Sequence, residues 1–311
     1  MAIEPRSGIA ASYGFKLESA VGTPITVDTH LPLISESIKR TEAFTESAGI
    51  LAGRRLMQSS QWNSGNITTG GDVQTELYTT SIRSLLTAMM GTETGGTLTY
   101  TYTPADLYGD SLTVQIGRPD TAGTINPFTY PGMKVASWEI ACAAGEIATM
   151  GLTFMGCIAD EGTATALVAP TYAAGLRPIK FSGANIVVAG GTLATVKQFT
   201  LSGDNKLEER RYLGSQFSAE PIESDLRSYT GSIQAQFDSL TAYQRYINHT
   251  EATLVATLAN GTSVVKVTAN VRFDGETPNV GGRAVLEQSL PFTVIAPGTL
   301  DSQGISIAYT L

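Results

Sequence analysis

The sequence contains little of what disulfide-rich, membrane-spanning and metal-binding proteins need. Its 311 residues include 2 cysteines and 2 histidines, and only 15% of them are charged. Two cysteines are too few for a disulfide scaffold in a chain of this length. No run approaches the roughly 18 apolar residues that a membrane-spanning helix needs, so no membrane association is expected. Residues 1–6 do not form a basic and apolar leader, which predicts a protein made and assembled in a cytoplasm.

Residues that build catalytic or metal sites are equally scarce. His30 and His249 are too few for a histidine-rich metal site, and no Cys-x-x-Cys or His-Glu-x-x-His spacing occurs. A Gly-x-Ser-x-Gly nucleophile motif is also absent, and the glycine pairs form no phosphate-binding loop. We therefore predict no catalytic residue, no metal and no cofactor, and a protein that is not an enzyme.

The two cysteines are expected to be reduced and buried. Cys142 and Cys157 lie on neighbouring predicted strands of one hairpin. A bridge would form between them only if the register placed them opposite each other. Both states stay open at the level of sequence.

The low content of charge also limits the partners. A soluble monomer typically carries about 25% charged residues, so 15% favours a surface largely covered by neighbouring subunits. The net charge of −8 disfavours tight binding of nucleic acid. Transient, non-specific passage of nucleic acid through a weakly acidic channel is compatible with it.

What the sequence does contain is alternation of apolar and polar residues with a period of two. It is clearest in four segments, and each predicts a half-buried strand. The segments are 97–103, 111–116, 135–142 and 147–154. Ala144-Gly145-Glu146 predicts a hairpin turn between the last two, and Asn260-Gly261 predicts another between 254–258 and 264–273.

Two short segments have helical periodicity. In the first, Ile82, Leu85, Leu86 and Met89 share one face of a helix that ends at Gly91. In the second, the apolar stripe consists of Leu240, Tyr243, Tyr246 and Ile247, and it is expected to lie against a sheet.

The segments before the two helices resemble each other. Residues 71–77 (GDVQTEL) match residues 231–237 (GSIQAQF) in pattern, with an offset of 231 − 71 = 160 residues. An arginine pair precedes each segment, and hairpins follow each helix. We predict a mainly β fold of two tandem domains, 1–163 and 164–311, each with one short flanking helix, joined by a linker within 160–175.

Residues 42–65 are predicted to form a long loop without regular structure. They contain several large apolar side chains, whose burial against another subunit is favoured over exposure to water. The arginine pairs lie in corresponding loops and are suited to pair with carboxylates of a neighbouring subunit. The candidate inter-subunit contacts are Arg54, Arg55, Leu56, Trp62, Arg210 and Arg211.

Several motifs resemble, in their order, those of tail tube proteins of long-tailed bacteriophages. In the first half they are residues 14–24 (GFKLESAVGTP), 31–39 (LPLISESIK), 53–55 (GRR), 71–90, 131–135 (PGMKV), 144–146 (AGE) and 154–156 (FMG). In the second half the resemblance is looser and extends through residues 278–282 (PNVGG). None of these motifs is catalytic.

The resemblance implies β-barrel-like or sandwich domains whose sheets join around a ring, and rings that stack into a hollow virion tail tube through which phage DNA passes. Two domains per chain would give a pseudo-sixfold ring with three copies, or alternatively a hexamer. The resemblance also implies contacts with tape-measure, tail terminator and baseplate proteins.

Two other interpretations of the sequence remain open. One is a β-rich capsid-decoration or tail-fibre protein, which would self-associate without forming open tubes. The other is an enzyme or carbohydrate-binding β-sandwich, which would bind sugars or metals.

Overall fold

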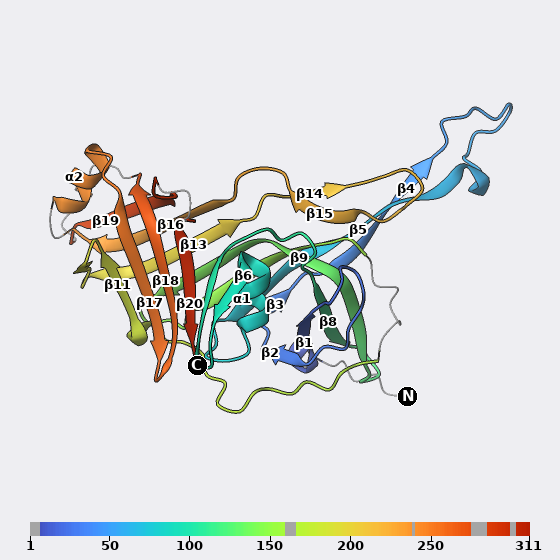
Figure 1. The fold of residues 1–311 in the computed structure, drawn as a ribbon. Helices are drawn as coiled ribbons and strands as arrows, with labels where there is room; N and C mark the ends of the chain where they lie inside the picture. Colours follow the sequence, from blue (N-terminus) through green and yellow to red (C-terminus); the bar gives the residue numbers. More distant parts are fainter. Residues whose placement is uncertain (1–6, 159–165, 238–239, 275–284, 299–302) are drawn as a thin grey trace.

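The structure, a computed structural model, describes residues 7–158, 166–237, 240–274, 285–298 and 303–311. They form mainly antiparallel sheet (Figure 1), which confirms the expected mainly β fold with two helices. The expected domain boundary at 163 and 164 and the 278–282 motif lie outside the described residues. Within the described ranges, no helix has the length and hydropathy to span a membrane.

Six strands of the first half follow one another in the hydrogen-bonding order β1-β8-β9-β10-β5-β4. Their bounds are Ser12–Leu17 (β1), Leu112–Pro119 (β8), Ile125–Ala143 (β9), Thr149–Gly156 (β10), Trp62–Glu76 (β5) and Lys39–Glu46 (β4). The connections add β2 (Thr29–Leu31) beside β1, β3 (Ser35–Glu36) beside β5, helix α1 (Arg83–Met90), and the hairpin of β6 (Gly91–Gly95) and β7 (Thr99–Pro104).

Six strands of the second half follow the same order, β11-β17-β18-β19-β16-β13. Their bounds are Ala184–Val188 (β11), Ala252–Asn260 (β17), Ser263–Phe273 (β18), Glu287–Val294 (β19), Ser228–Gln236 (β16) and Val196–Asp204 (β13). The remaining elements are β12 (Gly191–Thr192), β14 (Leu207–Arg210), β15 (Ala219–Glu223), α2 (Thr241–Ile247), β20 (Ile305–Thr310) and the 3-10 turns Gly8–Ala10, Ser59–Gln61 and Phe181–Gly183. We call strands at the same place in the two series equivalent.

The two halves share one hydrogen-bonded sheet. Residues 137–141 of β9 pair with β10 along one edge and with β13 along the other. Trp138 lies opposite Gly203 at this joint, and an added Cβ at Gly203 would lie 2.3 Å from the indole ring. β20 forms a second connection, because it pairs with β18 on one edge and with β7 on the other.

The core follows the predicted alternation. In β10, Met150, Leu152 and Phe154 are buried, while Thr149 and Thr153 face the other side of the sheet. The buried side chains of both halves form one continuous cluster. Burial of a large apolar side chain contributes about 1.5–3 kcal/mol, so these faces set the register of each strand.

The first predicted helix is confirmed. In α1, Leu85, Leu86 and Met89 are fully buried, and the helix ends at Gly91, which has a φ of 99°. In α2 the described members of the expected stripe are at most partly buried, and the side chain of Tyr243 lies outside the described part of the structure. Leu240 is 57% exposed and Ile247 is 51% exposed, because no described segment covers this side of the helix.

Both predicted hairpins form, β9–β10 and β17–β18, with Gly145 and Gly261 at positive φ in the turns. Cys142 precedes the first turn, whereas Cys157 follows the far end of β10. The register therefore separates the two cysteines, and both thiols are free and buried. Residues 166–175 contain no helix or strand, as expected of a linker, and residues 160–165 lie outside the described part.

Candidate functional site

A sheet of six strands, β5-β10-β9-β13-β16-β19, runs through both halves and has one face in the core. Its other face, the polar face, consists mainly of short polar side chains. They are Asp72, Gln74, Ser137, Glu139, Thr149, Thr153, Gln198, Thr200, Ser202, Asp204, Thr230, Ser232, Gln234, Glu287, Ser289 and Thr293. A shallow depression of about 450 Å³ lies over the joint between β9 and β13.

Hydrogen bonds between neighbouring strands hold the side chains of the polar face. The Thr153 hydroxyl donates to Asp72 (2.7 Å), and the Ser202 hydroxyl donates to Glu139 (3.1 Å). Neither carboxylate forms an ion pair among the described residues. The polar face is therefore acidic at its centre and rich in hydroxyl groups.

The ion pairs near the polar face lie at its borders. Lys197 pairs with Glu287, and Lys206 pairs with Asp204 at 2.6 Å. Partial burial would raise the pKa of Asp204, but hydrogen bonds from Lys206 outweigh it and lower that pKa below its ordinary value. Asp204 is therefore ionised at neutral pH.

The two ends of this sheet differ in how their edges are covered. β13 pairs with β16 along one edge and with β9 along the other. β3 and β4, equivalent to β13 in the first half, pair with β5 alone in the part of the chain that the structure describes. An uncovered edge presents unpaired N–H and C=O groups that favour pairing with another strand.

Residues 42–65, which we call the first arm, project away from the body (Figure 1). The expectation of a long irregular loop is wrong for its two ends. Residues 42–46 of β4 pair with residues 62–67 of β5, so only residues 47–61 form the tip of a β ribbon. Alternating Thr, Phe, Asn and Trp side chains suit such a ribbon, and the Phe44 and Trp62 rings stack at 4.3 Å between their centroids.

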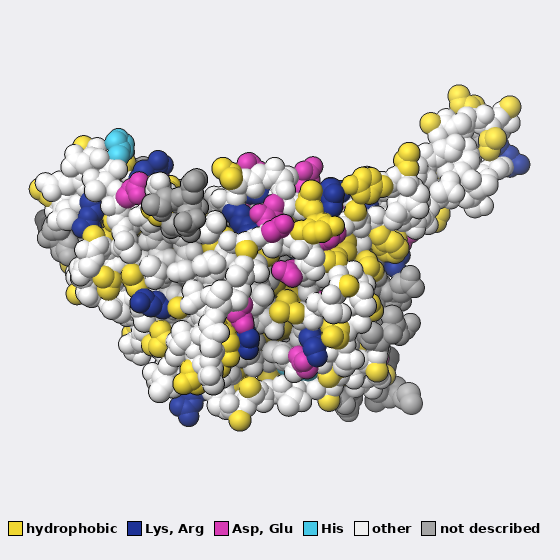
Figure 2. All heavy atoms as spheres, in the orientation of Figure 1, with side chains coloured by type: hydrophobic (Ala, Val, Ile, Leu, Met, Phe, Trp, Pro, Cys, Tyr) yellow, Lys and Arg dark blue, Asp and Glu magenta, His cyan; other side chains and the backbone are white. Residues whose placement is uncertain are grey.

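The first arm leaves its apolar side chains in water in the single chain. Ile50 is 96% exposed and Leu56 is 85% exposed. Figure 2 shows hydrophobic side chains along the arm and basic groups at its far end. The basic groups of the tip are Arg54 and Arg55. An apolar surface of this kind is typical of a site of protein–protein contact.

Residues 205–227, which we call the second arm, contain β14 and β15 and lie against the first half of the same chain. The Ile67 N–H donates to the Gln216 carbonyl (2.9 Å), and Phe217 forms a parallel bridge with Ile67. The Ser218 hydroxyl donates to the carbonyl of Gly156 at the end of β10 (3.2 Å). The second arm thus lies against β5 beside the end of β10.

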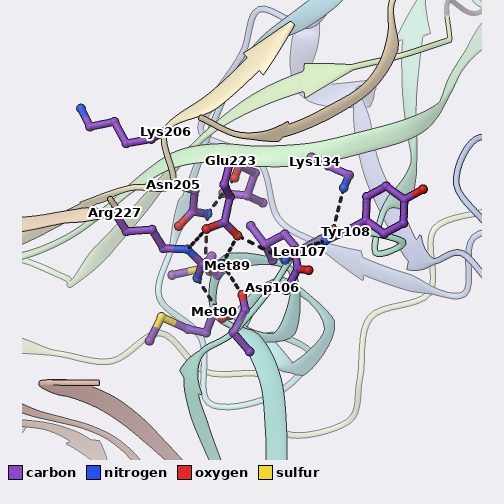
Figure 3. A network of polar contacts seen from close by, with 12 residues as sticks. Met89, Met90, Asp106, Leu107, Tyr108, Lys134, Asn205, Lys206, Glu223 and Arg227 are labelled. Atoms are coloured by element: carbon purple, nitrogen blue, oxygen red, sulfur yellow. Dashed lines mark hydrogen bonds and ion pairs between the residues drawn. The ribbon is translucent and has the colours of Figure 1, made fainter. Parts of the chain in front are cut away.

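Charged groups reinforce this contact. The Lys134 side chain, 2% exposed, donates to Glu220 (2.5 Å) and to the Leu107 carbonyl (2.6 Å). Arg227 pairs with Glu223 at 2.5 Å and donates to the Met90 carbonyl at the end of α1 (3.0 Å; Figure 3). Breaking such a buried pair typically costs about 3–5 kcal/mol, because it leaves one charge without compensation.

The structure separates the predicted contact residues into two groups. Arg54, Arg55, Leu56 and Trp62 lie together on the first arm and are exposed. Arg210 and Arg211 lie on the second arm and bond within the chain. Arg210 donates to the Glu220 carbonyl (2.9 Å), and Arg211 donates to the Ile67 carbonyl (3.1 Å).

Lys134, Glu220 and Arg227 were not among the residues predicted from the sequence. Lys134 lies between Met133 and Val135, within the buried stretch 129–135 of β9. A lone charge within an apolar strand is a signal of a buried partner. The identity of that partner depends on a contact between residues 86 positions apart.

Among the described residues, no group of three or more His, Cys, Asp or Glu side chains is arranged to hold a metal ion. A search of curated proteins gives no match. A family model described as "Phage tail tube protein" matches residues 8–294. Together with the mainly β fold, this match shows that the chain belongs to the phage tail tube protein family and is a structural component of the virion tail.

Proposed function

We propose that copies of this chain join side by side into a ring, and that the polar face of the six-stranded sheet forms its inner wall. Rings stack into a hollow tube, and phage DNA passes through the tube into the host. The chain is made and assembled in the host cytoplasm. Its further partners are the tape-measure, tail terminator and baseplate proteins.

The strongest support is the pairing between β9 and β13. These strands join the two halves of one chain edge to edge. The equivalent strands β3 and β4 pair with no strand along the corresponding edge among the described residues. Pairing with the second half of a neighbouring copy would cover that edge, and repetition of this contact around a closed ring would leave no free edge.

The equal strand order of the two series supports two tandem units, 1–163 and 164–311. If each unit occupies one-sixth of a ring, three chains complete it. A trimeric ring with pseudo-sixfold symmetry is therefore our proposal for the oligomer.

The chemistry of the polar face suits contact with DNA that must slide. Asp72 and Glu139 are negative and lack cationic partners among the described residues, so they repel phosphate groups. Hydroxyl and amide side chains keep the wall wetted without fixed positive charge.

Electron microscopy of a proline variant tests the edge contact. The Ser37 N–H donates to Asp72 on β5, so by alternation the Arg40 N–H faces the uncovered edge. We expect negative-stain images of the wild-type chain to contain rings or tubes of regular diameter. Arg40→Pro removes the edge donor and should leave a folded protein without rings.

The matched control is Arg40→Thr, which changes the same side chain but keeps the N–H, and which should assemble. Circular dichroism would verify that both variants are folded. Wild-type chains that stay dispersed at high concentration, or rings formed equally well by Arg40→Pro, would contradict the proposed edge pairing.

A further inference from the structure

An empty groove borders the second half at the place equivalent to the one where the first half holds the second arm. In the first half, Phe217 and Ser218 are seated between Ile67 on β5 and Gly156 on β10. The strand pairings define the equivalent positions. Gly71 pairs with Phe154, and the equivalent Gly231 pairs with Phe292. Ile67 precedes Gly71 by four residues, as Arg227 precedes Gly231, so these two positions are equivalent. Gly156 follows Phe154 by two residues, as Val294 follows Phe292, so these two positions are also equivalent.

Arg227 and Val294 line a groove of about 570 Å³. Its walls are partly apolar, and no described segment occupies it. The apolar walls include Pro104, Ala105, Leu226 and Ala296. Leu226 is 87% exposed, although an 8% exposed Arg227 side chain follows it directly. A large apolar side chain exposed beside a groove indicates a site for another apolar surface.

The first arm is the segment of the chain that is equivalent to the second arm. Met57 precedes Gly71 by 71 − 57 = 14 residues, as Phe217 precedes Gly231 by 231 − 217 = 14 residues. Met57 and Leu56 are exposed. The first arm projects from the end of the molecule opposite α2, so it points away from the second half of its own chain (Figure 1).

The charges of the tip and the groove are complementary. Arg54 and Arg55 are the charged residues within 47–61, which gives the tip a charge of +2. The groove is lined by three carboxylates and one arginine, 1 − 3 = −2. They are Asp106, Glu223, Asp225 and Arg227. Such complementarity favours one orientation of the arm in the groove.

From these observations we propose that the first arm of one copy seats in the groove between Arg227 and Val294 on the second half of its neighbour in the ring. This inference rests on the proposed function, because it needs copies that associate side by side. In this contact the first arm binds a neighbouring chain as the second arm binds the first half of its own chain. An arm that reached along the tube axis would instead contact the next ring.

A cross-linking experiment tests the contact directly. The variant Met57→Cys with Leu226→Cys places one thiol on the arm and one beside the groove, while both native cysteines are buried. Under mild oxidation of assembled rings, we expect covalent multimers that stop at the size of one ring on a non-reducing gel. Matched controls are each single variant, and Met57→Cys with Gln234→Cys, whose second thiol lies on the polar face of β16, the strand that follows Leu226.

Charge reversal gives an independent readout. Arg54→Glu with Arg55→Glu should raise the protein concentration needed for assembly at least about tenfold. Adding Asp106→Lys and Asp225→Lys to the same chain should restore assembly near the wild-type concentration. These residues are exposed or at the groove rim, so circular dichroism should show folded protein in every variant.

The outcomes separate this inference from the proposed function. If rings form but the 57–226 cross-link does not, the first arm does not seat in the groove of its neighbour. Covalent multimers larger than one ring would mean that the arm contacts the next ring instead. Both outcomes would overturn this inference and leave ring formation intact. Assembly of Arg54→Glu with Arg55→Glu at the wild-type concentration would also overturn it. Failure of the wild-type chain to assemble would contradict the proposed function itself.

Discussion

Single charged residues hold the second arm where apolar packing alone would leave it free to move. Lys134 is nearly inaccessible to water and is compensated by Glu220 and a carbonyl oxygen. A buried ammonium group needs such partners, because removing its hydration costs several kcal/mol. The pair therefore specifies one position of the arm more than it adds to stability.

His30 is a second buried titratable residue, and it makes stability depend on pH. It lies on β2 with 3% of its surface exposed, and its Nδ1 has no hydrogen-bond partner among the described residues. Burial lowers the pKa of His30 below its ordinary value, and the nearby Asp28 offsets part of this effect.

Acidification should therefore destabilise the fold. A lowered pKa means that the folded state binds a proton less readily than the unfolded chain does, so stability is lost as the pH falls below about 6.5. We expect the Tm to fall between pH 7.5 and 5.5, and to fall less in His30→Asn. The control is His249→Asn at an exposed site of positive φ, which should keep the wild-type slope. Equal slopes in all three proteins would contradict this assignment.

At the scale of elements, the joint between β9 and β13 depends on the absence of a side chain. The Trp138 ring lies over Gly203, and the two residues are direct partners across the strands. A residue with a Cβ would displace the indole ring from its packed position.

Gly203→Ala should consequently lower the free energy of unfolding by about 1–3 kcal/mol, as overpacking typically does. Gly151→Ala is the matched control. It lies on β10 of the same sheet, where an added Cβ meets nothing within 4 Å. It should be neutral or slightly stabilising, because alanine is less flexible in the unfolded chain. Urea unfolding measures both, and equal stabilities would show that the indole ring can move without cost.

At the scale of the whole molecule, the sign of the charge on the polar face decides whether the proposed tube repels or binds DNA. Asp72 and Glu139 lie on adjacent parts of one continuous wall formed by both halves. Each copy in a ring repeats these charges, so a change in one chain is multiplied around the lumen.

Reversal of these charges should make the tube bind DNA. Asp72→Lys with Glu139→Lys should still form tubes and should retain short DNA fragments in co-sedimentation, with release as salt is raised. The control is Glu146→Lys with Glu208→Lys, which changes the net charge equally at exposed sites outside the polar face. If both variants retain DNA equally, the polar face does not line the lumen.

The sequence alone was sufficient for both hairpins and for α1. Period-two alternation predicted the strands of both hairpins, and the apolar spacing before Gly91 predicted α1, because these signals depend on residues that are neighbours along the chain. The motif order and the 160-residue offset likewise required no coordinates.

Only the tertiary structure decided which surfaces are covered. The same arm pattern lies exposed in residues 42–65 and seated in residues 205–227. The difference arises because β9 brings the second half beside the first, so that Lys134 and Gly156 meet the second arm. Contacts between residues far apart in sequence depend on the assembled sheet. Within the described part of the single chain, the second arm has a surface to bind and the first arm has none.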